Sequence, residues 1–318
     1  MPLNIGRREF IAVLGSAAAS PLSARAQQLP GRTARIGLLQ TSRDNPVVGR
    51  GYPAFLDELK KSGFSAGQNL TIEVVRTDQD SQRLFAETAD LVRSNVELLV
   101  AEGSEIVLKA ALAASRTIPI VISAVNYDPI ARGYVKSLAR PGGNITGIVF
   151  LQTELAAKQV ELLTEAFPDR SRLAVLYDED SADQFAAAER QARSLRLDVR
   201  SLKLENPPYD FDVAFQSLAE GSPQMLLVLS SQYFTISRSH IAKLAIQQRL
   251  PTMFSYGVDP PAISRQVGFY VANNGAKPAD LPIQQPVKFE LVINLKTAKA
   301  IGVDLSTAIQ LRADEVIE

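Results

Sequence analysis

Short apolar runs alternate with amphipathic stretches from residue 34 onward. The apolar runs have the length and composition of buried strands, and they cover residues 34–40, 70–77, 96–103, 118–124 and 144–150. The stretches between several of them carry apolar residues at helical spacing, over 51–64, 81–95 and 104–115. Apolar strands separated by helices indicate a parallel sheet that is covered on both faces.

The same alternation starts again near residue 156. Strands are predicted over 172–180, 198–205, 223–231 and 250–257, and helices over 156–167, 181–196, 210–221 and 237–249. A Gly- and Pro-punctuated loop at 273–286 precedes a strand that runs into a helix over 287–303, with Asn294 as candidate cap and Gly302 as its end. The sequence therefore predicts an α/β protein with two Rossmann-like lobes, each a parallel sheet flanked by helices.

The first 28 residues do not fit this pattern. Arg7 and Arg8 precede a short apolar region, and Ala24-Arg25-Ala26 has the small-x-small form of a signal cleavage site. The apolar run is shorter than the roughly 20 residues that span a bilayer, and Pro21 interrupts any amphipathic helix. We expect residues 1–26 to be a cleaved signal peptide. The paired arginines followed by Phe10 resemble a twin-arginine signal, which would make the mature protein exported and periplasmic.

The amino-acid composition excludes several kinds of binding site and catalytic site. Basic and acidic residues balance at 34 each, so no overall field favours nucleic acid. The chain has no cysteine, which excludes disulfides, thiolate metal sites and cysteine nucleophiles. His240 is the single histidine and lies in a predicted helix, so neither a histidine-rich metal site nor a catalytic triad is expected. No phosphate-binding glycine motif follows a strand. We expect no metal, no cofactor and no enzymatic activity.

Polar side chains follow the predicted strands, where open parallel sheets bind ligands. This rule selects short polar or phenolic groups, and the candidate ligand-binding residues are Thr41, Ser42, Gly103, Ser104, Asn126, Tyr127, Asp128, Tyr177, Ser230, Ser231 and Tyr256. Each has a structural alternative: the serines can cap helices, Asp128 before Pro129 can form a turn, and the tyrosines can belong to the core. The set is polar and nearly uncharged, without the arginine cluster that phosphate or a dicarboxylate favours. The acidic run 178–180 is a cluster that could carry chemistry, but a solvated strand end explains it equally well.

Four segments carry a resemblance to a known family. They are RREFIAVLGSAAASPLSARAQQ, SLARPGGNITGI, KPADLPIQQPVKFELVINLKTAKAIGV and LRADEVIE. They closely resemble the exported ABC transporter substrate-binding proteins that are related to tryptophan and aromatic amino-acid binding proteins. The resemblance covers nearly the whole chain. It implies a type I periplasmic binding protein fold, in which two lobes joined by a hinge close on a small ligand.

The resemblance also implies lobe limits and contacts. Lobe 1 would comprise residues 33–148 plus about 255–285, and lobe 2 residues 149–254 plus about 286–318. Residues 102–104 and 126–128 would offer ligand contacts from lobe 1, and Tyr177, Ser230 and Ser231 would face them from lobe 2. One departure concerns residues 250–259, where such proteins usually carry an additional helix and turn between LPTMF and SYG. Because this crossing is short, the hinge geometry and the ligand affinity are expected to differ from those of the family.

The expected function is that of an exported receptor, which captures a small ligand, such as an aromatic or branched amino acid, and delivers it to an ABC permease in the inner membrane. Hinge closure would supply the mechanism, because a ligand that touches both lobes stabilises the closed state. A periplasmic sensory or regulatory domain on the same fold is one alternative, and a degenerate paralogue with weakened binding is another. An exported enzyme would need an acid–base cluster, and none is evident in the sequence.

Overall fold

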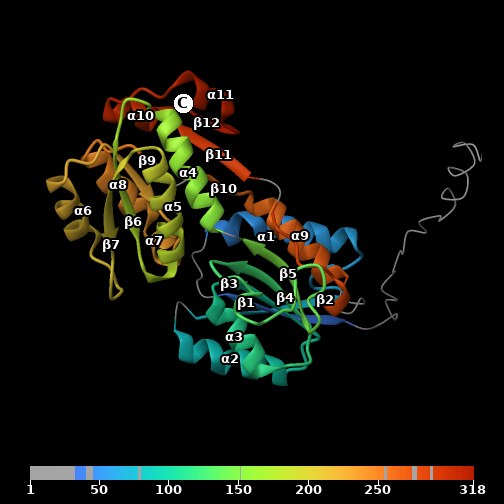
Figure 1. The fold of residues 1–318 in the computed structure, drawn as a ribbon. Coiled ribbons are helices and arrows are strands. Elements are labelled where there is room, and N and C mark those ends of the chain that lie inside the picture. Colours follow the sequence, from blue (N-terminus) through green and yellow to red (C-terminus); the bar gives the residue numbers. More distant parts are fainter. Residues whose placement is uncertain are drawn as a thin grey trace, which may run out of the picture.

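The computed structural model of the chain describes residues 33–40, 46–77, 80–150, 152–253, 256–273, 278–286 and 289–318, without the side chains of residues 46–49 and 256. The predicted signal peptide, Thr41 and Ser42 lie outside the described residues. Figure 1 shows two lobes, each built on its own sheet. The predicted α/β fold with parallel sheets flanked by helices is confirmed.

The first lobe holds a five-stranded parallel sheet in the order β2-β1-β3-β4-β5. Its elements are β1 (Ala34–Gln40), α1 (Pro46–Lys61), β2 (Leu70–Arg76), α2 (Ser81–Arg93), β3 (Leu98–Gly103), α3 (Glu105–Ala114), β4 (Ile120–Val125), β5 (Ile145–Phe150), α9 (Pro260–Ala272) and η2 (Pro278–Asp280). Helices α2 and α3 cover one face, and α1 and α9 cover the other (Figure 1). Two apolar clusters therefore enclose the sheet, which explains why its strands are apolar throughout.

The second lobe repeats this plan with a four-stranded parallel sheet in the order β7-β6-β8-β9. Its elements are α4 (Gln152–Ala166), β6 (Arg172–Tyr177), η1 (Glu179–Ser181), α5 (Ala182–Ser194), β7 (Asp198–Lys203), α6 (Phe211–Glu220), β8 (Met225–Val228), α7 (Gln232–Ile236), α8 (Arg238–Gln247) and β9 (Thr252–Met253). Helices α4 and α5 pack on one face, and α6 and α8 on the other. The edge strand β9 is only two residues long.

A third, small sheet follows the second-lobe sheet in the chain. Strand β10 (Tyr256–Val258) pairs antiparallel with β11 (Phe289–Asn294), which pairs in parallel with β12 (Glu315–Ile317). Helices α10 (Leu295–Ile301) and α11 (Thr307–Arg312) complete the C-terminal part, which packs against the second lobe. The predicted single strand over 250–257 is thus wrong in one respect. It is split between β9 in the second-lobe sheet and β10 in the third, because the chain leaves the second lobe there.

Helix α9 is an element that we did not predict from the hydrophobic pattern. The sequence does carry its start signal, because Asp259 caps the helix through Ala262 N at 3.2 Å and Pro260 occupies the first turn. Ile263, Val267 and Tyr270 then recur at helical spacing and face the first-lobe sheet. The chain therefore returns to the first lobe through α9, which packs along α1.

The C-terminal strand-to-helix transition agrees with the prediction. The Asn294 side chain accepts a hydrogen bond from Thr297 N at 2.8 Å, and Gly302 ends α10 with a left-handed φ of 72°. Among the described residues, no helix combines the length and hydrophobicity that a membrane crossing requires.

Candidate functional site

A cavity of about 530 Å³ lies between the two lobes. Its first-lobe wall comes from the carboxyl ends of β1, β3, β4 and β5 and from α9, and its second-lobe wall from the loop after β8, from α7 and from the start of α5. The volume falls within the range of about 300–1,000 Å³ that small-molecule sites occupy. The cavity therefore stands where the strand-end rule places a ligand, and both lobes contribute to it.

Five of the predicted ligand-binding residues line this cavity, and they are Gly103, Ser104, Asn126, Ser230 and Ser231. The Ser104 hydroxyl stands at the N-terminus of α3 but makes no capping hydrogen bond. Ser231 likewise precedes α7 without capping it, and its hydroxyl donates to Asp178 Oδ2 instead. Neither serine is thus used as a helix cap, although capping is the usual structural role at these positions.

Three other candidates point elsewhere. Tyr127 is buried in the first-lobe core, where it packs edge to face with Tyr134, and burial raises its pKa. Asp128 is exposed and closes a turn by accepting from the N–H groups of Ile130 and Ala131. Tyr177 stacks on Phe185 of α5, with ring centroids 4.1 Å apart. None of the three lines the cavity, and the Tyr256 side chain lies outside the described part of the chain.

Glu102 contributes a carboxylate to the first-lobe wall and is linked to two neighbouring side chains. Its carboxylate accepts from Gln40 Nε2 at 2.7 Å, and Gln40 Oε1 accepts from Arg76 Nε at 2.9 Å. Burial raises the pKa of Glu102, against smaller opposing effects of the Gln40 hydrogen bond and the Arg76 charge. The buried Gln40 amide thus links Arg76 to Glu102, and the Arg76 charge also acts on Glu102 directly through space.

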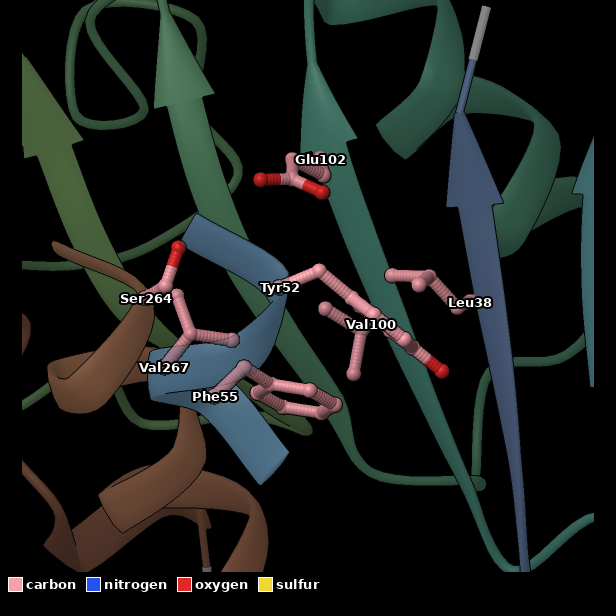
Figure 2. Close-up of a pocket in the computed structure, with 7 residues that line it drawn as sticks. All are labelled: Leu38, Tyr52, Phe55, Val100, Glu102, Ser264 and Val267. Atoms are coloured by element: carbon pink, nitrogen blue, oxygen red, sulfur yellow. The ribbon is translucent and has the colours of Figure 1, made fainter. Parts of the chain in front are cut away.

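The cause of this burial is visible below the carboxylate. A small pocket of about 20 Å³ lies there. Figure 2 shows the residues that line it, with the Glu102 carboxylate and the Ser264 hydroxyl at the same end. Its remaining lining is largely apolar and consists of Leu38, Tyr52, Phe55, Val100 and Val267. Glu102 therefore stands on the core formed by α1, α9 and the sheet, while it borders the interlobe cavity on its other side.

A buried carboxylate organises the second-lobe wall. Asp178 is 1% exposed and accepts hydrogen bonds from Ser181 Oγ at 2.7 Å, from Ser231 Oγ and from Tyr209 OH at 3.3 Å. The expectation of a solvated acidic strand end is therefore wrong for Asp178, because these donors replace water. Glu179 fits that expectation better, since it is exposed and lies 3.1 Å from Lys203 Nζ.

The lobes are joined across the cavity by Asn126. Its Nδ2 donates to the Ser230 carbonyl at 2.8 Å, while Gln184 Nε2 donates to the same oxygen and Gln184 Oε1 accepts from Ser230 N. Asn126 adopts a left-handed φ of 63°, which asparagine tolerates better than most residues. This interlobe contact fixes Ser230 between a first-lobe amide and a second-lobe amide.

We expect the Asn126→Gly variant to open more readily without a ligand. Glycine keeps the left-handed backbone but removes a hydrogen bond whose net value is about 1 kcal/mol, so the closed population should fall several-fold. Small-angle X-ray scattering of the ligand-free protein should then give a larger radius of gyration. Asn206→Gly is the matched control, because Asn206 has a similar φ of 57° but is exposed in the second lobe. Equal radii for both variants would contradict this role of Asn126.

Two other features lie apart from the cavity. His240 on α8 has Nε2 3.1 Å from Asp212 Oδ2 and is not among the cavity residues. A second cavity of about 330 Å³ lies within the second lobe between α8, β9, β11 and α10, and its lining is mostly aliphatic. Among the described residues, no group of three or more His, Cys, Asp or Glu side chains is arranged to hold a metal ion.

The chain is similar to several known proteins. The profile of the family described as ABC transporter substrate binding protein matches residues 44–317. A tyrosine-binding protein of Clostridioides difficile is 23% identical over 283 residues, which cover 83% of this chain and 80% of that protein. Two solved structures share the fold over 90% of this chain and the whole of theirs. They are a conserved domain protein from Vibrio cholerae, with a TM-score of 0.80 and 24% identity, and an ABC domain in complex with L-Trp from Streptococcus pneumoniae, with 0.79 and 22%.

Proposed function

This chain belongs to the ABC transporter substrate-binding protein family, and we propose that it is an exported receptor that captures an amino acid-like ligand between its lobes and delivers it to an ABC permease. The interlobe cavity carries this proposal, because a ligand in it would touch both lobes and stabilise their closed arrangement. The ligands named for the tyrosine-binding relative and for the L-Trp complex support an aromatic amino acid as a first choice.

The proposal extends to the residues that contact the ligand, the limits of the two lobes and the cellular location of the protein. We propose that Gly103, Ser104, Asn126, Ser230 and Ser231 contact the ligand, since they line the cavity from opposite lobes. Lobe 1 is proposed to span residues 33–148 plus about 255–285, and lobe 2 residues 149–254 plus about 286–318. Residues 1–26, with the Arg7-Arg8 pair, are proposed to direct export to the periplasm and to be removed.

A thermal-shift screen tests this function. We expect an L-amino acid or related solute to raise the unfolding midpoint of the protein lacking residues 1–26, because a ligand at one hundred times its Kd adds about 2.7 kcal/mol of stability. The screen covers aromatic and branched amino acids first and other small solutes afterwards. Recovery of the ligand unchanged after incubation distinguishes a receptor from an enzyme.

A pair of variants locates the binding. Ser104→Phe places a ring in the cavity and should abolish the shift, whereas Ala113→Phe, which is exposed on the same helix, should retain it. A shift that survives Ser104→Phe would place the ligand elsewhere. No shift with any solute would contradict the receptor function and leave the short crossing at 250–259 as the first feature to examine.

A further inference from the structure

Carboxylates dominate the charged groups of the interlobe cavity. Among the described residues, five acidic side chains and one basic side chain line it, and they are Glu102, Glu105, Glu179, Asp180, Asp183 and Arg132. The segment 41–45, outside the described residues, contains one arginine and one aspartate, so its formal charge is zero. The predicted contacts came from strand ends and are nearly uncharged, whereas three of these carboxylates belong to η1 and the start of α5.

Two of the five carboxylates already have cationic partners. Glu105 lies 3.2 Å from Lys109 Nζ and 3.9 Å from Arg132 Nε, and Glu179 lies 3.1 Å from Lys203 Nζ. Arg132 is thus balanced by Glu105. Within the described part of the chain, Glu102, Asp180 and Asp183 have no ion pair, and they face the cavity from both lobes. Asp180 and Asp183 are exposed here, so their charges would lose water and require a counter-charge when the lobes close on a ligand.

The surroundings of Glu102 and Asp180 favour a cation beside them. Burial raises the pKa of Glu102, as described above. Burial also raises the pKa of Asp180, and the charges of Asp178 and Glu179 raise it further. A cation placed between the lobes would stabilise the ionised form of both groups.

A carboxylate of the protein itself lies in the first turn of α3. The N-terminus of α3 faces the cavity at Ser104, and helix N-termini attract anions. Glu105 supplies a carboxylate in that first turn. Burial alone would raise its pKa, but hydrogen bonds from Tyr134 and Lys109 outweigh this effect and lower it. An ionised side chain in the first turn makes this helix end less attractive to a ligand carboxylate.

The rest of the wall suits an apolar body. Val125, Phe150, Ile236, Val258 and Ile263 border the same cavity. Their aliphatic and aromatic surfaces can cover a ring or a branched chain once the lobes close. The cavity thus combines an apolar surface with unpaired carboxylates on opposite lobes.

We infer that the ligand is an organic cation, a protonated amine on an aromatic or aliphatic body without a free carboxylate, and that Glu102 receives its ammonium group. This inference rests on the proposed receptor function, but in place of the aromatic amino acid considered there it assigns an amine that lacks the carboxylate. It separates this chain from its relatives named for zwitterionic amino acids, although the fold and the position of the cavity are shared.

Isothermal titration of three compounds with the same phenol body tests the inference. Tyramine carries only the amine, L-tyrosine carries amine and carboxylate, and 3-(4-hydroxyphenyl)propionate carries only the carboxylate. We expect tyramine to bind at least about tenfold more tightly than tyrosine, which is the effect of one charged contact, and the propionate not to bind. A wider set of amines, amino acids and carboxylates is titrated alongside, so that a different apolar body does not hide the preference.

A matched pair of variants assigns the contact. Glu102→Gln keeps the Gln40 neighbourhood but removes the charge, and it should weaken amine binding at least about tenfold, whereas Glu220→Gln, exposed at the end of α6, should leave it unchanged. Amine affinity should also fall as the pH is lowered through the raised pKa of Glu102, because the carboxylate becomes neutral, and it should fall less steeply in Glu102→Gln. The groups that face Glu102 from the neighbouring elements are Gln40, Arg76, Tyr52 and Ser264.

The outcomes separate this inference from the receptor function. If a zwitterion or an anion binds most tightly, the cation preference is overturned and the receptor function stands. If amines bind best but Glu102→Gln binds them as the wild type does, the assignment of Glu102 is overturned. If no compound binds, both the inference and the proposed function fall.

Discussion

Replacing Gly147 with alanine should destabilise the first lobe by about 3 kcal/mol or more. Gly147 lies in β5 opposite Ile122 of β4 and has a φ of 131°, a region that side chains with a Cβ rarely adopt. A Cβ at this position would stand 2.1 Å from the Ile122 carbonyl oxygen and 2.6 Å from its nitrogen. Both obstacles are backbone atoms of a buried central strand, so the sheet itself would have to shift.

Urea unfolding followed by circular dichroism measures this effect. Gly143→Ala is the matched control, because Gly143 lies just before the same strand and an added Cβ there meets nothing within 4 Å. The control should unfold at nearly the wild-type midpoint, while Gly147→Ala should unfold at clearly lower urea or accumulate as insoluble protein. Equal midpoints for the two variants would show that β4 and β5 tolerate the change.

The repeated alternation of apolar strands and helices was sufficient to predict both sheets, because strands covered on both faces leave a strong signal. Leu99, Ile122, Val175 and Leu227 are all fully buried in strands that the pattern located. Helix α9 has the same kind of stripe and a start signal at Asp259-Pro260. It was missed because it follows directly on an interlobe crossing, where no apolar run separates it from the preceding strand.

The strand-end rule located the candidate site but could not orient each side chain. Beyond β4 the backbone turns left-handed at Asn126, and this turn carries Tyr127 into the core instead of the cavity. At the end of β6, Tyr177 packs on the α5 ring of Phe185 while the next residue, Asp178, is buried. Local sequence does not reveal which face a terminal strand residue takes, because the following turn decides it.

The charged part of the wall depends on how the lobes meet. Asp180 lies in η1 and Asp183 in the first turn of α5, where acidic residues are common for reasons of helix electrostatics alone. Only the approach of the first lobe turns these positions into the wall of a cavity that also contains Glu102. Charge excess at the site is therefore a property of tertiary structure, and the balanced composition of the chain gives no sign of it.

Asp178→Ala should destabilise the second lobe by about 3 kcal/mol or more and weaken ligand binding at the same time. The carboxylate is buried and accepts from three hydroxyl groups, those of Ser181, Ser231 and Tyr209, and from Ser181 N at 3.2 Å. Removing it leaves the Ser231 and Tyr209 hydroxyls without this acceptor, at about 1–3 kcal/mol for each group that stays dry, whereas Ser181 keeps the Asp178 carbonyl oxygen as an acceptor. Ser231 would lose the contact that fixes its side chain, so the cavity wall before α7 would loosen.

Thermal unfolding and titration with the best ligand of the screen measure the two consequences of the Asp178 change together. Asp178→Asn keeps the volume and one acceptor oxygen, so it should fall between the wild type and Asp178→Ala in both measurements. Asp169→Ala is the control in the same lobe, because Asp169 is exposed in the turn before β6, and it should alter neither quantity. A stable Asp178→Ala protein with unchanged affinity would mean that water can replace the carboxylate. In that case Asp178 would neither stabilise the second lobe nor position Ser231 at the cavity.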